Sequence, residues 1–222
     1  MGVTRQICNV ASVVVLGGGT ASRLGGVSKP DYRVKGTRLI DLLFNQLDVI
    51  GFSGRVIAVV PECVELPDHV TKTLEDPPFG GPLAGIGAAV ETLRDLEDDS
   101  LVALATCDAP MATLIIPELL GTLISQKKSV AADLRLAGVA PISSDGWPQF
   151  AHGVYSMGAL RSIKYERNRS IHSAFKKLNV CLVPDSRGLC MDVDTPEDAR
   201  AFADLLAKRK RSVFQYAKSG LG

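Results

Sequence analysis

The sequence lacks an apolar run long enough to cross a lipid bilayer, because none reaches the roughly 18 residues that a spanning helix needs. The first apolar stretch, residues 10–16, is too short, and no signal-peptide pattern flanks it. The sequence also lacks an excess of one charge, since 25 Lys and Arg offset 24 Asp and Glu for a net charge of +1. We therefore expect neither a membrane protein nor a secreted one, and no binding to nucleic acid or to an anionic membrane.

Paired cysteines are lacking as well. The five cysteines contain no C-x-x-C pair and are odd in number, so we expect reduced thiols in a cytoplasmic protein. No Pro- or Ser-rich linker, low-complexity tract or internal repeat divides the 222 residues. We therefore predict a single domain over residues 1–222, with a core at about 10–207 and a basic C-terminal tail at 208–222.

Short apolar runs alternate with amphipathic stretches along most of the chain. The runs predict strands at 10–16, 55–60, 101–105, 129–132, 149–155 and 180–183. The amphipathic stretches predict helices at 37–50, 82–94, 115–126 and 170–178, and a last helix capped by Thr195. An Asp-Gly pair at 145–146 predicts a tight turn. This alternation predicts an α/β fold of three layers, α/β/α, around a mostly parallel mixed sheet.

The segment after the first strand is rich in glycine and reads LGGGTASRLGGVSKP over residues 16–30. It is not a P-loop, because no Gly-Lys-Ser/Thr triplet closes it, and it is not a dinucleotide fingerprint, because Ser22 occupies the third glycine position. Two cations, Arg23 and Lys29, lie in this loop. Backbone N–H groups and two cations suit a triphosphate, so we interpret the loop as a phosphate-binding element.

Carboxylates follow two of the predicted strands. Asp108 comes just after the strand at 101–105, where open α/β sheets bind ligands. Asp192 and Asp194 follow the strand at 180–183, and either could complete a metal site or cap the next helix. Carboxylates beside phosphates are natural Mg²⁺ ligands, so the pattern predicts magnesium-assisted chemistry on a nucleotide.

Four ordered motifs resemble the nucleotidyltransferases of the molybdenum cofactor guanylyltransferase type. They are the glycine loop with Arg23 and Lys29, GPLAG at 81–85, CDAP at 107–110 and DVDTPED at 192–198. The resemblance implies a fold like that of nucleotide-diphospho-sugar transferases. It also implies transfer of GMP from GTP to the terminal phosphate of molybdopterin, with release of pyrophosphate and with magnesium as cofactor.

The resemblance also assigns roles to individual residues. The implied catalytic residues are Arg23, Lys29 and Asp108. The implied nucleotide-binding residues are Leu16, Gly17, Gly18, Gly19, Lys29, Asp76, Gly81 and Asp108, with Asp76 accepting hydrogen bonds from guanine. The implied acceptor-binding residues are Pro82, Leu83, Gly85 and Arg169. The implied metal ligands are Asp108 and Asp194.

Other functions stay open at this stage. The family has asparagine where Asp192 and Asp194 stand, and Asp-x-Asp also fits cytidylyltransferases or other small-molecule nucleotidyltransferases of the same fold. A non-catalytic nucleotide-binding protein is a further alternative, which the intact Arg23, Lys29 and Asp108 disfavour. A dinucleotide-dependent oxidoreductase is disfavoured by Ser22. Beyond GTP and molybdopterin, we expect only transient contacts with other molybdenum cofactor proteins.

Overall fold

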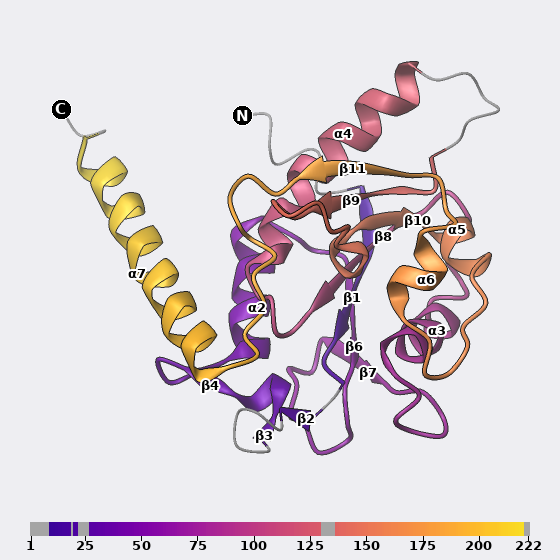
Figure 1. The fold of residues 1–222 in the computed structure, drawn as a ribbon, viewed down its shortest axis with the longest axis horizontal. Helices are drawn as coiled ribbons and strands as arrows, with labels where there is room; N and C mark the ends of the chain where they lie inside the picture. Colours follow the sequence, from indigo (N-terminus) through magenta and orange to yellow (C-terminus); the bar gives the residue numbers. More distant parts are fainter. Residues whose placement is uncertain (1–8, 19, 22–26, 130–135, 220–222) are drawn as a thin grey trace.

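A seven-stranded sheet forms the centre of the protein in the computed structural model, which describes residues 9–18, 20–21, 27–129 and 136–219 (Figure 1). The strand order is β11-β9-β10-β8-β1-β6-β7. The strands are β1 (Val10–Leu16), β6 (Arg55–Val59), β7 (Val70–Thr73), β8 (Leu101–Thr106), β9 (Gly138–Ile142), β10 (Val154–Ser156) and β11 (Val180–Pro184). Within this sheet of the described chain, β10 alone runs antiparallel to its neighbours. Two short antiparallel strand pairs of the described chain lie outside it, namely β2 (Thr20–Ala21) with β3 (Val27–Ser28) and β4 (Arg33–Val34) with β5 (Thr37–Arg38).

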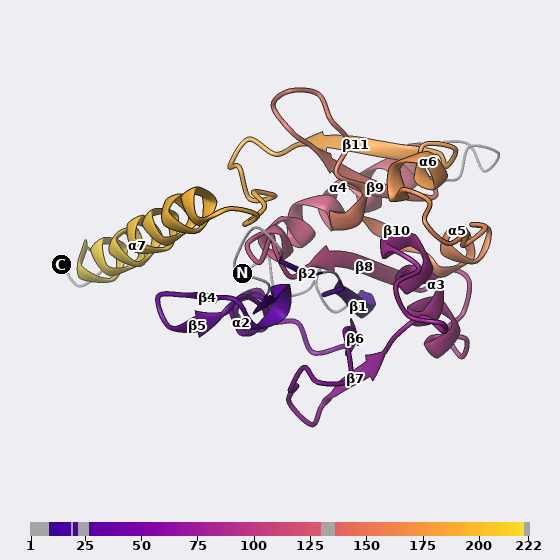
Figure 2. The same ribbon diagram turned by 60° about the horizontal axis from the view of Figure 1, so that its bottom comes forward.

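Helices cover both faces of the sheet (Figures 1 and 2). One face carries α2 (Leu39–Val49), α4 (Ile116–Ser129) and the first turns of α7 (Pro196–Ser219). The other carries α3 (Pro82–Thr92), α5 (Met157–Arg161) and α6 (Ile171–Phe175). The described chain also contains the 3₁₀ turns η2 (Lys29–Asp31), η3 (Ala112–Ile115) and η5 (Phe150–His152). The predicted three-layer α/β fold with a mostly parallel sheet is confirmed.

The alternation of side chains along β1 explains why the sheet is covered twice. Val13 and Val15 belong to the core cluster under α2 and α4, whereas Val14 and Leu16 belong to the cluster under α3. All four are buried, as expected for a central parallel strand that has apolar residues on both faces. Among the described residues, no helix is both long enough and apolar enough to span a bilayer.

The last helix begins as its sequence predicts. The Thr195 hydroxyl accepts a hydrogen bond from the Asp198 N–H at 3.1 Å, and the Asp198 carboxylate accepts one from the Thr195 N–H at 2.8 Å. This reciprocal capping box satisfies backbone donors that the first turn leaves unpaired. Phe202, one turn further on, is fully buried against the sheet. The helix backbone continues through the basic run at 208–211 and ends at Ser219.

Two predicted strands differ from the structure. The strand predicted at 129–132 is wrong for Ser129, which is the last residue of α4. Residues 130–132 lie outside the described chain, and the next described strand is β9. The prediction at 149–155 is only partly right, because η5 precedes the shorter strand β10. The Tyr155 hydroxyl donates to the Phe150 carbonyl at 2.7 Å, which fixes this 3₁₀ turn against the core. The pattern of apolar residues along the sequence does not reveal such a side-chain hydrogen bond.

Gly17, the first residue after β1, has no room for a side chain. A Cβ there would lie 2.6 Å from Cγ1 of Val60 and 2.8 Å from Cγ of Pro30, whereas a Cβ at Gly18 would meet nothing within 4 Å. We expect Gly17→Ala to lower the free energy of unfolding by about 1–3 kcal/mol through overpacking. Gly18→Ala, the matched control, should change it by less than about 1 kcal/mol. Urea denaturation measures both, and equal effects of the two variants would contradict the close-packing argument.

His152 is buried in η5, and its Nδ1 has no hydrogen-bond partner among the described residues. Burial lowers its pKa to about 4, although the negative charges of Asp108 and Asp185 act in the opposite direction. Since the unfolded chain has the ordinary histidine pKa of about 6.5, it binds a proton between pH 6.5 and 4 that the folded protein does not bind.

This histidine therefore predicts a pH dependence of stability. As the pH falls from about 6.5 to 4, His152 should lower the free energy of unfolding by up to about 3 kcal/mol, and it should contribute no pH dependence above that window. Urea denaturation across this window should show a smaller loss for His152→Gln than for the unmodified protein. The exposed His69, replaced in the same way, serves as the control. An identical loss in the unmodified protein and His152→Gln would refute the assignment.

Candidate functional site

The candidate site lies where the parallel strands β6, β1 and β8 end side by side. Leu16 is in register with Val59 on one side and with Thr106 on the other. The Gly17 N–H donates to the Val59 carbonyl at 2.9 Å, and the Cys107 N–H donates to the Leu16 carbonyl at 2.9 Å. The glycine loop and the CDAP motif therefore start next to each other, at the edge where open α/β sheets bind ligands.

Lys29 connects two carboxylates at this edge. Its Nζ lies 2.7 Å from Oδ2 of Asp108 and 2.5 Å from Oδ1 of Asp194. The three residues come from the glycine loop, the end of β8 and the segment before α7. The Val193 N–H donates to the Asp108 carbonyl at 2.8 Å, which holds the late motif against the CDAP motif. The structure thus brings together three residues that the sequence motifs assign to one site.

The charges at this cluster do not balance. Burial lowers the pKa of Lys29, but the carboxylates of Asp108 and Asp194 raise it by more, so the ammonium stays charged. Burial raises the pKa of Asp108, yet the Lys29 charge and hydrogen bond bring it below its ordinary value. Asp192 is exposed as a whole residue. Desolvation of its carboxylate and the charges of Asp108 and Asp194 nevertheless raise its pKa to about 7. Three acidic side chains therefore surround one ammonium, which contacts two of them, Asp108 and Asp194.

This donor set fits a metal ion that is shared with a substrate. Oδ1 of Asp108 is buried and has no hydrogen-bond partner among the described residues, so this oxygen has unused capacity to accept a hydrogen bond or to bind a cation. Over the same residues, no three His, Cys, Asp or Glu side chains are arranged to hold a metal by themselves. Mg²⁺ does not need such a cage, because it commonly takes one or two carboxylates and completes its shell with water and substrate phosphates. Asp108 and Asp194 would be the carboxylates that hold it.

The loop between β7 and α3 carries Asp76, which is exposed. Its shape is fixed by contacts on both sides of Gly80. The Gly80 N–H donates to Oε1 of Glu75 at 2.9 Å, and the Gly80 carbonyl accepts from the Asn168 N–H at 2.7 Å. The Arg167 guanidinium adds hydrogen bonds to two carbonyls of the Asp76 loop, those of Pro77 and Pro78. An exposed carboxylate on a braced loop is suited to bind a polar ligand group.

The GPLAG motif forms the start of α3. Gly81 has a φ of +85°, a conformation that favours glycine. Pro82 is exposed in the first turn, whereas the Leu83 side chain is fully buried in the core. A Cβ at Gly85 would lie 2.9 Å from Cγ1 of Val59, so this glycine allows α3 to approach β6 closely. The motif therefore places the N-terminus of α3 beside the end of β6.

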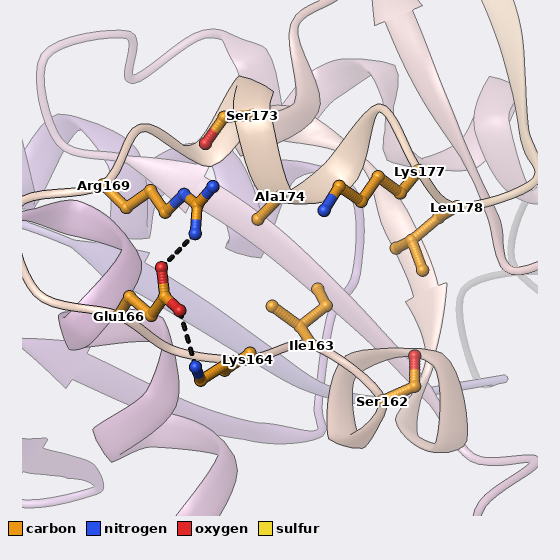
Figure 3. A pocket seen from close by; sticks show the side chains of 9 residues that line it. All are labelled: Ser162, Ile163, Lys164, Glu166, Arg169, Ser173, Ala174, Lys177 and Leu178. Atoms are coloured by element: carbon orange, nitrogen blue, oxygen red, sulfur yellow. Dashed lines mark hydrogen bonds and ion pairs between the residues drawn. The ribbon is translucent and has the colours of Figure 1, made fainter.

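The remaining predicted residues are placed differently. Gly19 and Arg23 lie outside the described residues. Leu16 is buried at the end of β1, and Gly18 is exposed beyond it. Arg169 pairs with Glu166 and faces a cavity beside α6 (Figure 3), and no described contact links it to the Lys29 cluster.

Several residues that hold the site together were not predicted. Glu75, Arg167 and Asn168 brace the Asp76 loop, and Val193 holds the late motif through its backbone. The one local signal among them is Asn168, whose φ is +58°, because asparagine tolerates left-handed backbone better than most residues. Cys107 is buried, and burial raises the pKa of its thiol well above the ordinary value. Cys107 is therefore suited to packing and not to nucleophilic attack.

Comparison with solved structures shows the same fold in other proteins. Molybdopterin-guanine dinucleotide biosynthesis protein A from Archaeoglobus fulgidus matches with a TM-score of 0.59 at 20% identity, over 89% of this chain and 99% of that one. Rv0371c from Mycobacterium tuberculosis H37Rv matches with a TM-score of 0.61 at 17% identity, over 87% and 97%. The inositol-1-phosphate CTP transferase from T. maritima matches with a TM-score of 0.58 at 15% identity, over 86% and 91%.

A search of curated protein sequences found no significant match. Residues 13–179 match the family described as the MobA-like NTP transferase domain, and this match covers most of the chain. It includes the glycine loop, GPLAG and CDAP. The chain therefore belongs to the MobA-like NTP transferase family and has the nucleotidyltransferase fold of that family.

Proposed function

We propose that this nucleotidyltransferase is a magnesium-dependent guanylyltransferase of the cytoplasm. It would join GMP from GTP to the terminal phosphate of molybdopterin and release pyrophosphate. The observation that carries the proposal is Lys29 between Asp108 and Asp194 at the ligand-binding edge of the sheet. The fold shared with the Archaeoglobus fulgidus molybdopterin-guanine dinucleotide biosynthesis protein supports the choice of acceptor.

The reaction needs no nucleophilic side chain. An oxygen of the acceptor phosphate attacks the α-phosphorus of GTP, the bond to the bridging oxygen breaks, and pyrophosphate leaves with the electron pair. Positioning and charge stabilisation therefore carry the catalysis. Lys29, with Arg23 of the same loop, would hold the triphosphate. Bound Mg²⁺, held by Asp108 and Asp194, would supply a positive charge beside the phosphates.

Asp76 would read the base. Guanine presents two donors, N1–H and N2–H₂, to one carboxylate, and cytosine offers no equivalent pair. The Asp76 loop is braced by Glu75 and Arg167, so the carboxylate is presented on a fixed backbone. The backbone of Leu16, Gly17, Gly18 and Gly19 would contact the rest of the nucleoside.

The acceptor would bind between the start of α3 and the Lys29 cluster. Gly81, Pro82, Leu83 and Gly85 would shape this side of the site, with the buried Leu83 acting through its backbone. We keep Arg169 as a candidate contact for an extended acceptor. Transient docking with other molybdenum cofactor proteins would deliver or remove the cofactor.

A cytidylyltransferase is the second candidate, because the fold is shared with the T. maritima inositol-1-phosphate CTP transferase. A protein that binds nucleotides without turnover is the third. The two alternatives differ from the first in measurable ways, since one changes the preferred nucleotide and the other abolishes pyrophosphate release.

One prediction of this mechanism concerns Asp108. Purified protein with GTP, molybdopterin and Mg²⁺ should release pyrophosphate, and chelation of Mg²⁺ should abolish the release. Asp108→Asn should lower turnover by about 10²-fold or more, since it removes a charge from the metal and from Lys29. The exposed Asp48 at the end of α2, changed to Asn, should leave turnover unchanged. Unchanged turnover of folded Asp108→Asn would eliminate the proposed metal-assisted mechanism.

A second prediction concerns Asp76. In parallel assays with GTP, CTP, ATP and UTP, GTP should give the largest kcat/KM. Asp76→Asn should lower kcat/KM for GTP by about 10- to 100-fold, because it replaces charge-assisted hydrogen bonds, and it should leave the small CTP rate unchanged. Asp68→Asn, an exposed acid on the neighbouring loop, is the control. A preference for CTP would keep the reaction class and overturn the guanine assignment.

A further inference from the structure

A cavity of about 290 Å³ lies beside α6, between that helix and the segment that follows α5 (Figure 3). Its size is at the lower end of the range for small-molecule sites. Four charged side chains line it, namely Lys164, Glu166, Arg169 and Lys177. The Lys29 cluster contributes none of the lining residues, so this cavity is distinct from the proposed nucleotide site.

Positive charge dominates the cavity. Glu166 pairs with Lys164 at 2.8 Å and also with Arg169. Hydrogen bonds from Lys164 and Arg169 lower the pKa of Glu166, so this carboxylate is ionised at neutral pH. Lys177 makes no hydrogen bond or ion pair with the described part of the chain. Three cations and one carboxylate leave a net charge of +2 around the opening.

The backbone that presents these charges is fixed from its other side. Tyr165 packs on Gly87 of α3, where a Cβ would lie 2.8 Å from the Tyr165 Cβ, and its hydroxyl donates to the Leu160 carbonyl at 2.7 Å. Arg167 and Asn168 are bonded to the Asp76 loop. The backbone that carries Lys164, Glu166 and Arg169 is therefore fixed before any ligand binds. This lowers the entropic cost of binding.

The rest of the lining is apolar or already hydrogen-bonded. Ile163 is buried, and Ala174 and Leu178 are partly buried at the edge of the same core cluster. The hydroxyls of Ser162 and Ser173 donate to backbone carbonyls of their own helical turns. These hydroxyls are therefore not free to donate to a ligand, and selectivity must come from the charges and the apolar floor.

We propose that this cavity binds a phosphate monoester whose organic part is small and apolar. A phosphate monoester carries a charge near −2 at neutral pH, which matches the net charge of the opening. The planar Arg169 fork and the two ammonium groups are the groups that bind phosphate oxygens. Ile163, Ala174 and Leu178 provide a surface for the organic part. This proposal rests on the lining of the cavity and not on the nucleotide specificity of the Lys29 site, and it shares only Arg169 with the acceptor contacts proposed above.

Titration of the ¹⁵N-labelled full chain with phenyl phosphate tests this site. The amide resonances of Arg169, Ser173 and Lys177 should shift in a saturable way, and Lys177→Gln should weaken binding about tenfold. Lys176→Gln is the matched control, because Lys176 is an exposed neighbour that does not line the cavity. Thermal unfolding of both variants checks that each is folded.

Ligand variation tests the chemical class. Benzoate, with one charge, and inorganic phosphate, without an apolar part, should each bind more weakly than phenyl phosphate. Equal affinity for benzoate would overturn the assignment to a doubly charged phosphate. Shifts confined to the Gly17 and Lys29 region, unsaturable shifts, or equal weakening by Lys176→Gln and Lys177→Gln would overturn the site itself.

Discussion

The ion pairs of Lys29 with Asp108 and Asp194 are the interaction on which the site depends. They join residues that are 79 and 165 positions apart in the chain. All three groups are partly withdrawn from water, so each charge would be costly without the others. The single ammonium does not offset all of the acidic groups, because Asp192 lies close enough to Asp108 and Asp194 for their charges to raise its pKa. In the proposed reaction, the two carboxylates would give up the ammonium to the polyphosphate and bind the metal ion in its place.

Close packing behind the Lys29 cluster limits which residues can stand at two glycine positions. Gly17 admits no side chain between Val60 and Pro30, and Gly85 lets α3 approach Val59. The backbone of the glycine loop can thus start directly beside β6 and β8. His152 is buried close enough to Asp108 for the two groups to interact electrostatically, and burial keeps its side chain neutral near neutral pH. The candidate site is therefore a small polar surface on a tightly packed apolar support.

Much of this arrangement could be predicted from the sequence, because it follows from local patterns. β-Branched runs such as Val10–Leu16 predict buried strands, and acidic residues just after such strands predict a shared ligand edge. The direction of Arg169 could not be predicted, since it depends on Glu166 and on a segment braced against α3. The 3₁₀ turn before β10 could not be predicted either, because the Tyr155 hydroxyl, from outside the turn, stabilises it by donating to the Phe150 carbonyl.

In the proposed mechanism, Asp108 and Asp194 would release Lys29 and bind a metal ion when the nucleotide binds. The most direct test is a crystal structure with Mn²⁺ and a non-hydrolysable GTP analogue, in which anomalous scattering locates the metal. We expect the anomalous peak to place Mn²⁺ within coordination distance of both carboxylates, and the Lys29 ammonium to contact the phosphates. A metal bound elsewhere, or Lys29 still between the two carboxylates beside bound nucleotide, would contradict it.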